Sequence, residues 1–125
     1  MAVKFLTDDW ATEITGALQA HEQFKASADM SLQFVVNDAP EGEVKFYMDA
    51  SSNDPVQVMG ELENADVTIS TSYETATAIF SGELNTQMAF MTGKIKVNGN
   101  LAKLMTQQAA LGHWASAVAG VEVEY

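Results

Sequence analysis

The chain has 125 residues, of which 47% are hydrophobic, and its formal net charge at pH 7 is −11, with six lysines and no arginine. This length suits a single domain covering residues 1–125, and the apolar share is typical of a globular protein rather than a disordered one. The acidic balance and the lack of arginine argue against nucleic acid as a partner. The absence of cysteine excludes disulfides, thiolate catalysis and zinc–thiolate sites.

The sequence also contains no recognisable targeting segment. No apolar run approaches the roughly 18 residues that a membrane-spanning helix needs. Residues 1–9 turn acidic after one lysine, unlike a secretory signal, and the final residues do not form a peroxisomal address. We therefore expect a cytoplasmic protein.

The first predicted element is an amphipathic helix. Thr7 or Asp8 is suited to its N-cap, and apolar residues then recur at helical spacing. Phe24 is expected to close this helix against the core. His21 lies near its C-terminal end, where we expect it to be solvated or stabilised by the helix dipole. The apolar face consists of Trp10, Ile14, Ala17 and Leu18.

Three strands are predicted next, because apolar and polar residues alternate. The segments 30–36 and 44–48 are predicted to pair as an antiparallel hairpin, joined by the turn-rich residues 37–42. A third strand covers 56–59 and is followed by the polar loop 61–66. The apolar positions of the first two strands are Met30, Leu32, Phe34, Val36, Val44, Phe46 and Met48.

A fourth strand carries Val67 and Ile69. Thr71 and Glu74 then have the spacing of a capping box, which predicts that a helix begins here. Its buried side is expected to come from Ala76, Ile79 and Phe80, and Gly82 is expected to end it.

The stretch 85–100, NTQMAFMTGKIKVNGN, predicts a short helix, a strand and a turn. Asn85 is a suitable N-cap, and Gly93 a suitable end for the helix. In the strand, Ile95 and Val97 share one face and the lysines share the other.

A final helix is predicted from Leu101, with a bend or break near Gly112. Residues 121–125 alternate, and either fray or add to a sheet edge. The apolar face of this helix is expected to contain Leu101, Leu104, Met105, Gln108, Leu111, Ala115 and Val118. Together, these elements predict an α+β fold with one mostly antiparallel sheet covered on one face by helices.

Catalytic motifs are missing from the chain. There is no nucleophile elbow, phosphate-binding loop or dinucleotide fingerprint. His21 and His113 lie on different predicted helices and are expected to be far apart. The acidic pairs are expected to form a solvated surface. We therefore expect no enzyme activity, no metal and no cofactor.

Three short blocks carry a family resemblance: ADVTI at 65–69, FSGEL at 80–84 and MAFMTGKIKVNGN at 88–100. Their order and spacing resemble the sterol carrier protein type two family, a lipid-transfer and sterol-binding domain. The resemblance extends to about Gln108 and is weaker over the first half of the chain. It implies a five-stranded sheet with packed helices and an apolar tunnel between the layers. It also implies non-catalytic binding and transfer of fatty acids, fatty acyl esters, phospholipids or sterols.

Seven methionines and eleven aromatic residues would give such a tunnel a soft lining. The final helix is expected to be the lid, with Leu104, Met105, Leu111 and Trp114 facing inward. Gln107 or Gln108 either binds a lipid head group or is simply solvated. Periodicity alone favours the simpler interpretation that these residues are ordinary core. The candidate ligand-binding residues are Phe34, Phe46, Met48, Phe80, Met88, Phe90, Met91, Leu101, Leu104, Met105, Gln108, Leu111 and Trp114.

A second function stays open at this point. Domains resembling this family also occur attached to enzymes, so the chain could be an accessory or dimerisation module that supports a lipid-metabolising enzyme. The expected partner is an apolar lipid, with transient membrane contact, and the state is a monomer or a homodimer. The acidic, arginine-free composition argues against coenzyme A esters as ligands.

Overall fold

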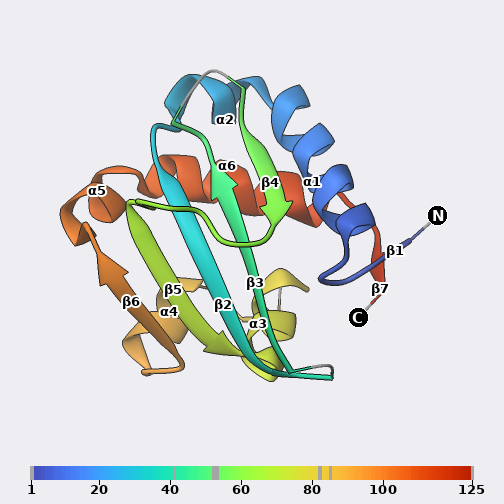
Figure 1. The fold of residues 1–125 in the computed structure, drawn as a ribbon. Helices are drawn as coiled ribbons and strands as arrows, with labels where there is room; N and C mark the ends of the chain where they lie inside the picture. Colours follow the sequence, from blue (N-terminus) through green and yellow to red (C-terminus); the bar gives the residue numbers. More distant parts are fainter. Residues whose placement is uncertain (1, 41, 52–53, 82, 85, 125) are drawn as a thin grey trace.

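The computed structural model describes residues 2–40, 42–51, 54–81, 83–84 and 86–124. Its centre is a five-stranded sheet in the order β4-β3-β2-β5-β6 (Figure 1). The strands are β2 (Ser31–Ala39), β3 (Gly42–Asp49), β4 (Val56–Met59), β5 (Val67–Ser72) and β6 (Ile95–Gly99).

The sheet is mixed rather than purely antiparallel. Strands β2, β3 and β4 form the predicted antiparallel meander, and β6 is antiparallel to β5. Strand β5 runs parallel to β2, with Phe34 opposite Ile69. The expectation of an α+β fold with a five-stranded sheet is confirmed.

Helices cover one face of this sheet, and Figure 1 shows α3 and α6 crossing behind it while α1 runs beside β4. The helices are α1 (Asp8–Ala20), α2 (Glu22–Ser27), α3 (Tyr73–Phe80), α4 (Thr86–Met91), α5 (Leu101–Thr106) and α6 (Gln108–Ala119). The two ends of the chain meet in a small parallel pair, β1 (Val3–Lys4) with β7 (Val123–Glu124). The alternating tail therefore pairs with the start of the chain and not with the main sheet.

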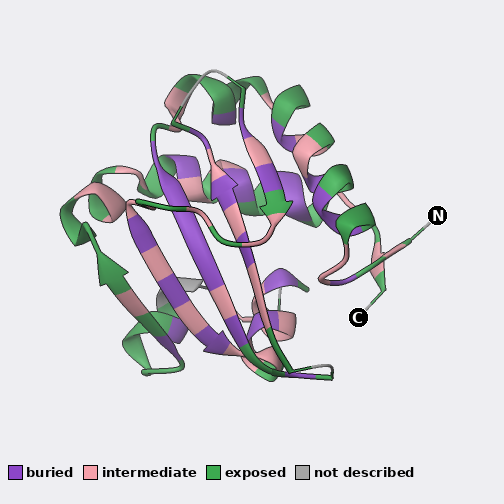
Figure 2. Ribbon diagram, viewed as in Figure 1, coloured by how far each residue is buried: buried purple, intermediate pink, exposed green. Residues whose placement is uncertain are grey.

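The core lies between the helices and the sheet, and Figure 2 shows buried residues along β2 and at intervals on β5 and α6. Leu32, Phe34 and Val36 face it from the central strand β2, and none is more than 6% exposed. The opposite sheet face is also covered at its centre. There Gln33 is buried, donating to the Phe46 and Gly60 carbonyls and accepting from the Leu62 amide.

The first helix ends earlier than predicted, and His21 is the reason. His21 adopts an extended backbone, and its Nδ1 accepts a hydrogen bond from the Phe24 amide at 3.1 Å. It is therefore the N-cap of a separate helix, α2, rather than a solvated residue within one helix. Phe24 is fully buried in α2, as expected of a residue that closes this region against the core.

Helix α3 begins one residue later than the capping box predicted. Ser72, not Thr71, is the N-cap, and its hydroxyl accepts from the Thr75 amide at 3.2 Å. The predicted end at Gly82 and the predicted cap at Asn85 lie outside the described residues.

The final helix is broken at Gln107 and continues through Gly112, so the predicted break lies five residues too late. The side-chain oxygen of Gln107 accepts from the Asp29 amide at 2.9 Å, which holds the junction of α5 and α6 against the start of β2. The break changes which side of α6 faces the core. The buried residues of α6 are Ala110, Trp114, Ala117 and Val118, and the predicted apolar-face residues Leu101, Met105, Gln108 and Ala115 are exposed.

Candidate functional site

Four aromatic rings meet between α3, α6 and the sheet, and we call Phe34, Phe46, Phe80 and Trp114 the aromatic layer. Phe34 stacks on Phe46 with ring centroids 4.6 Å apart, and on Trp114 at 5.5 Å. Phe80 packs edge-on against Trp114 at 5.4 Å. Such pairs add about 0.5–1.5 kcal/mol each beyond the area they bury.

The local sequence explains why these rings converge. Phe34 and Phe46 are direct cross-strand partners on β2 and β3, so their side chains share one sheet face. Phe80 is the last residue of α3, and Trp114 lies on the buried side of α6. Trp10 of α1 joins the layer from a third helix, with its ring 5.0 Å from Phe46 and 5.6 Å from Phe80.

Polar atoms are buried beside this layer. Gln57 of β4 is 1% exposed, and its side-chain oxygen accepts a hydrogen bond from Trp114 Nε1 at 3.1 Å. Gln57 Nε2 and Trp10 Nε1 have no hydrogen-bond partner among the described residues. A buried donor without a partner costs about 1–3 kcal/mol. Two donor nitrogens are therefore available to an acceptor oxygen inside an otherwise aromatic region.

A second polar cluster holds α5 in place. Asp66 Oδ2 accepts from the Ser31 amide at 2.9 Å and forms an ion pair with Lys103 of α5 at 3.1 Å. Burial opposes ionisation of this carboxyl group, but the hydrogen bonds from Ser31 and the charge of Lys103 outweigh it, so the pKa of Asp66 lies below its ordinary value.

The structure divides the sequence-predicted site residues into two groups. Five lie in the core, namely Phe34, Phe46, Met48, Phe80 and Trp114, and Leu104 and Leu111 are partly buried against it. The other six, all on α4, α5 and the start of α6, are exposed: Met88, Phe90, Met91, Leu101, Met105 and Gln108. The expectation that Met105 faces inward is wrong, because its side chain is 66% exposed.

Two residues beside the aromatic layer were not among the predicted site residues. Trp10 was assigned only to a helix face, although its place on that face does predict burial. Gln57 lies between Val56 and Val58, and the pattern gives no reason to turn the glutamine inward. Only the register of β4, which places Gln57 opposite the buried Met48, decides this.

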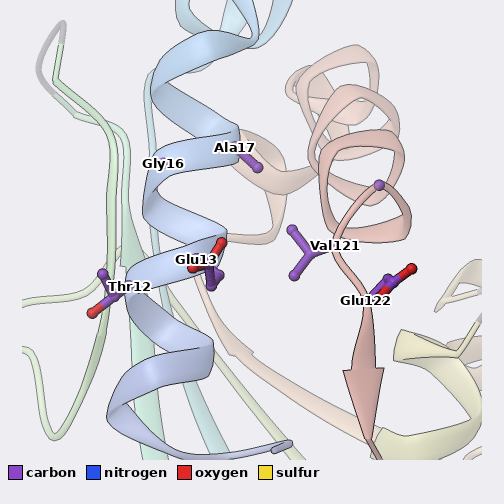
Figure 3. A pocket seen from close by; sticks show the side chains of 7 residues that line it. Thr12, Glu13, Gly16, Ala17, Val121 and Glu122 are labelled. Atoms are coloured by element: carbon purple, nitrogen blue, oxygen red, sulfur yellow. The ribbon is translucent and has the colours of Figure 1, made fainter. Parts of the chain in front are cut away.

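Two of the surface grooves that the described residues form lie beside α1. One, of about 610 Å³, lies between α1 and the segment after α6, with Glu13 and Glu122 among its lining residues (Figure 3). The other, of about 220 Å³, lies between α1 and β4. Neither is an apolar tunnel between the layers, and the first is lined mainly by polar and small residues.

The described residues contain no group of three or more histidine, cysteine, aspartate or glutamate side chains placed to hold a metal ion. The two histidines are nevertheless neighbours, since the rings of His21 and His113 lie 5.4 Å apart. The expectation that they are far apart is wrong, because α6 packs against α2. Among the described helices, none is both long and apolar enough to cross a bilayer.

Known proteins share both the sequence pattern and the architecture of this chain. Residues 12–112 match the SCP-2 sterol transfer family. The chain belongs to this family. Hydroxysteroid dehydrogenase-like protein 2 of Mus musculus is 32% identical over 111 residues, which are 83% of this chain and 20% of that protein. Sterol carrier protein 2 of Bos taurus is 32% identical over 88 residues, 70% of this chain and 16% of that protein.

Solved structures of the SCP-2 family share the fold. A crystal structure of sterol carrier protein 2 superposes with a TM-score of 0.77 at 23% identity, covering 94% of this chain and 99% of that one. The resemblance seen in the sequence blocks is therefore confirmed at the level of family and fold. This chain spans about a fifth or less of the two curated relatives described above.

Proposed function

We propose that this SCP-2 family protein binds and transfers lipids without catalysing a reaction, and that the ligand lies between the helices and the sheet. Its ligands are fatty acids, fatty acyl esters, phospholipids or sterols. The observation that carries the proposal is the family match over residues 12–112, which includes every strand of the main sheet.

The interior has a composition suited to this task. Met30 and Met48 lie beside the aromatic layer in the same core, and methionine is the apolar side chain that repacks most easily. An acyl chain gains about 0.8 kcal/mol for each methylene group that it buries. Affinity can therefore arise without a specific polar contact, and broad selectivity follows.

The buried donors suggest where the polar end of the ligand lies. Gln57 Nε2 and Trp10 Nε1 are N–H donors, so they fit a carboxylate, ester or hydroxyl oxygen. Such an oxygen would remove the cost of leaving these groups unpaired. We propose that they orient the ligand, while the apolar contacts supply most of the affinity.

The first test is native mass spectrometry of gently purified protein, followed by lipid extraction and titration with a fluorescent fatty acid. We expect a co-purified acyl lipid, or saturable binding of about one fatty acid per chain. A protein that carries no lipid and does not bind the fluorescent fatty acid contradicts the proposal.

The role of the buried donors can be tested by NMR. The chain contains two tryptophans, Trp10 and Trp114, so two indole N–H signals are expected. Addition of palmitic acid should move the Trp10 indole signal and the Gln57 side-chain signals, because these groups gain an acceptor. Binding that leaves both sets of signals in place would exclude them from ligand contact.

A substitution at Gln57 extends this test. Gln57→Met keeps the size of the side chain but removes its N–H donors together with the oxygen that accepts from Trp114 Nε1, and we expect fatty acid affinity to fall by about threefold to tenfold. Gln19→Met on α1 is the matched control, because Gln19 is exposed and donates to the Pro55 carbonyl, away from the aromatic layer. Equal affinities for the two variants would argue against a role for Gln57.

The comparisons also favour a second candidate function, an accessory or dimerisation module that supports a lipid-metabolising enzyme. The supporting observation is that the matched region occupies only 20% of a relative named for dehydrogenase likeness. Sedimentation velocity of the purified chain tests it. A stable dimer that takes up no fatty acid would favour the module, whereas a lipid-loaded monomer would count against it.

A further inference from the structure

Exposed apolar side chains are concentrated on two short helices. Among the described residues, six large apolar side chains are exposed, and five of them lie on α4 and α5. A soluble surface normally scatters such residues singly, and a gathered set marks an interaction surface. The five are Met88 at 54% exposed, Phe90 at 47%, Met91 at 75%, Leu101 at 46% and Met105 at 66%.

The fold places both helices at the same side of the molecule. Strand β6 is an edge strand of the sheet, α4 precedes it and α5 follows it directly. The Lys94 amide donates a hydrogen bond to the Ala89 carbonyl at 2.9 Å, which joins α4 to the start of β6. Figure 1 shows α4, β6 and α5 along one side, away from the two termini, and Figure 2 shows that much of this side is exposed.

The charge of this region is opposite to that of the rest of the chain. Residues 84–121 contain three lysines and no aspartate or glutamate, so all 17 acidic residues lie elsewhere. Lys94 and Lys96 are exposed and flank the buried Ile95 at the start of β6. Lys103 is engaged with Asp66 and holds α5 at the sheet edge.

We propose that α4, α5 and the two lysines Lys94 and Lys96 form a docking surface for a bilayer that contains anionic phospholipid. We call it the β6-edge surface. Its apolar side chains enter the interfacial region of the bilayer, and its lysines meet the lipid phosphates. This proposal rests on the proposed lipid transfer, because docking here brings the protein to the membrane where it loads or releases its ligand.

Charge favours a bilayer over a second copy of this chain. In a two-fold dimer the same surface meets itself, so lysines would face lysines with no acidic residue in the range 84–121 to balance them. An anionic lipid surface supplies the missing negative charge, while the acidic remainder of the molecule is repelled and turned away.

Vesicle co-sedimentation tests the proposal with the full chain. We use vesicles of phosphatidylcholine with 30% phosphatidylglycerol, and pure phosphatidylcholine for comparison. We expect stronger binding to the anionic vesicles and a marked loss at high salt. For K94Q/K96Q on anionic vesicles we expect binding to fall by about fivefold per lysine. The control is K4Q/K25Q, which removes two lysines outside the surface and should change binding far less.

The apolar contribution is tested with M91S/M105S, which should weaken binding to both kinds of vesicle by about tenfold. Val58→Ser is the control, because Val58 is the sixth exposed apolar residue and lies on β4 at the other sheet edge. Absence of vesicle binding, or equal binding by all variants, overturns the proposal. The proposal is also overturned if the unaltered chain is a dimer and M91S/M105S makes it monomeric without changing vesicle binding.

The docking surface and the proposed function can fail separately. K94Q/K96Q should bind a fluorescent fatty acid in solution as well as the unaltered protein does. If the chain docks on anionic vesicles but binds no fatty acid, the proposed lipid binding and transfer is contradicted, and the proposed docking surface is not. A chain that binds fatty acid but not vesicles would contradict only the docking surface.

Discussion

Gly99 illustrates how a single backbone position constrains this fold. It lies opposite Val67 at the end of β6 and has a φ of 113°, a conformation that side chains rarely allow. A Cβ atom there would lie 2.5 Å from the Asp66 carbonyl oxygen, which also accepts from the Asn100 amide at 2.8 Å. The glycine lets β6 and the start of β5 approach closely enough for that bond.

We therefore predict that Gly99→Ala destabilises the protein by about 2–4 kcal/mol, because it adds both backbone strain and a clash with main-chain atoms. Urea denaturation measures this change. Gly112→Ala is the control: Gly112 lies within α6 with no atom near its Cβ position, so alanine there should stabilise by about 0.5–1 kcal/mol. Similar effects at both positions would contradict the explanation.

Asp66 gives a prediction on pH dependence. Its pKa is lowered in the folded protein from an ordinary value of 3.8. The folded state therefore favours the ionised carboxylate, and the stability it contributes is present above pH 3.8 and is lost as the pH falls through the folded-state pKa. We expect Asp66→Asn to lower the unfolding free energy at pH 6, and the difference from the unaltered protein to shrink toward pH 3.

Denaturation at several pH values measures that difference. Glu63→Gln is a suitable control, because Glu63 is exposed in the same loop. A difference between Asp66→Asn and the unaltered protein that stayed constant from pH 6 to pH 3 would rule out this role for the carboxylate.

At the scale of elements, α1 closes the edge strand β4. Thr15 Oγ1 donates to the Gln57 carbonyl at 2.9 Å and accepts from the Gln57 amide at 2.8 Å. One side chain thus satisfies two backbone groups that an edge strand would otherwise leave open. These two hydrogen bonds also hold the Gln57 backbone in place. The Gln57 side chain extends from this part of β4 toward Trp114.

We predict that Thr15→Val, which has nearly the same shape, destabilises the protein by about 1–3 kcal/mol, because two backbone groups lose their partner. Hydrogen exchange should show faster exchange at the Gln57 amide. Thr12→Val on the exposed side of α1 provides the comparison and should change stability by no more than about 0.5 kcal/mol. If the Gln57 amide exchanged at an unchanged rate in Thr15→Val, the edge-closing role would have to be abandoned.

At the scale of the whole molecule, charge is both large and unevenly distributed. The negative charges that make up the net charge of −11 repel one another in the compact state, although residues 84–121 contain no aspartate or glutamate. Taken by itself, a net charge of −11 opposes contact with an anionic lipid surface. The separation of the lysine-bearing β6-edge surface from the acidic remainder changes that argument.

We predict that raising NaCl from 10 to 200 mM at pH 7 increases Tm by about 4 °C, equivalent to about 1 kcal/mol, because salt screens the self-repulsion. Calorimetry at pH 7 measures this shift. The same experiment near pH 4.2, the isoelectric point expected from the sequence, should show little change. A Tm at pH 7 that is independent of salt would mean that self-repulsion is not a significant term.

Local patterns in the sequence determined much of this protein. Alternating residues predicted β2 and β3 with Phe34 and Phe46 on one face, because side-chain direction in a strand follows from the backbone. The three blocks at 65–69, 80–84 and 88–100 together indicated the family, which the match over residues 12–112 confirms. These features depend on neighbours in the chain, so a single sequence contains them.

Only the tertiary structure decided features that depend on residues far apart in the chain. The parallel pairing of β5 with β2, the hydrogen bond from Asp29 to Gln107 at the break between α5 and α6, and the inward turn of Gln57 all need a distant partner. The same holds for the site. The predicted residues include a true aromatic layer, but helical periodicity could not separate it from Met91 and Met105, which lie on the surface. Periodicity gives the spacing of an apolar face, and only packing determines what that face meets.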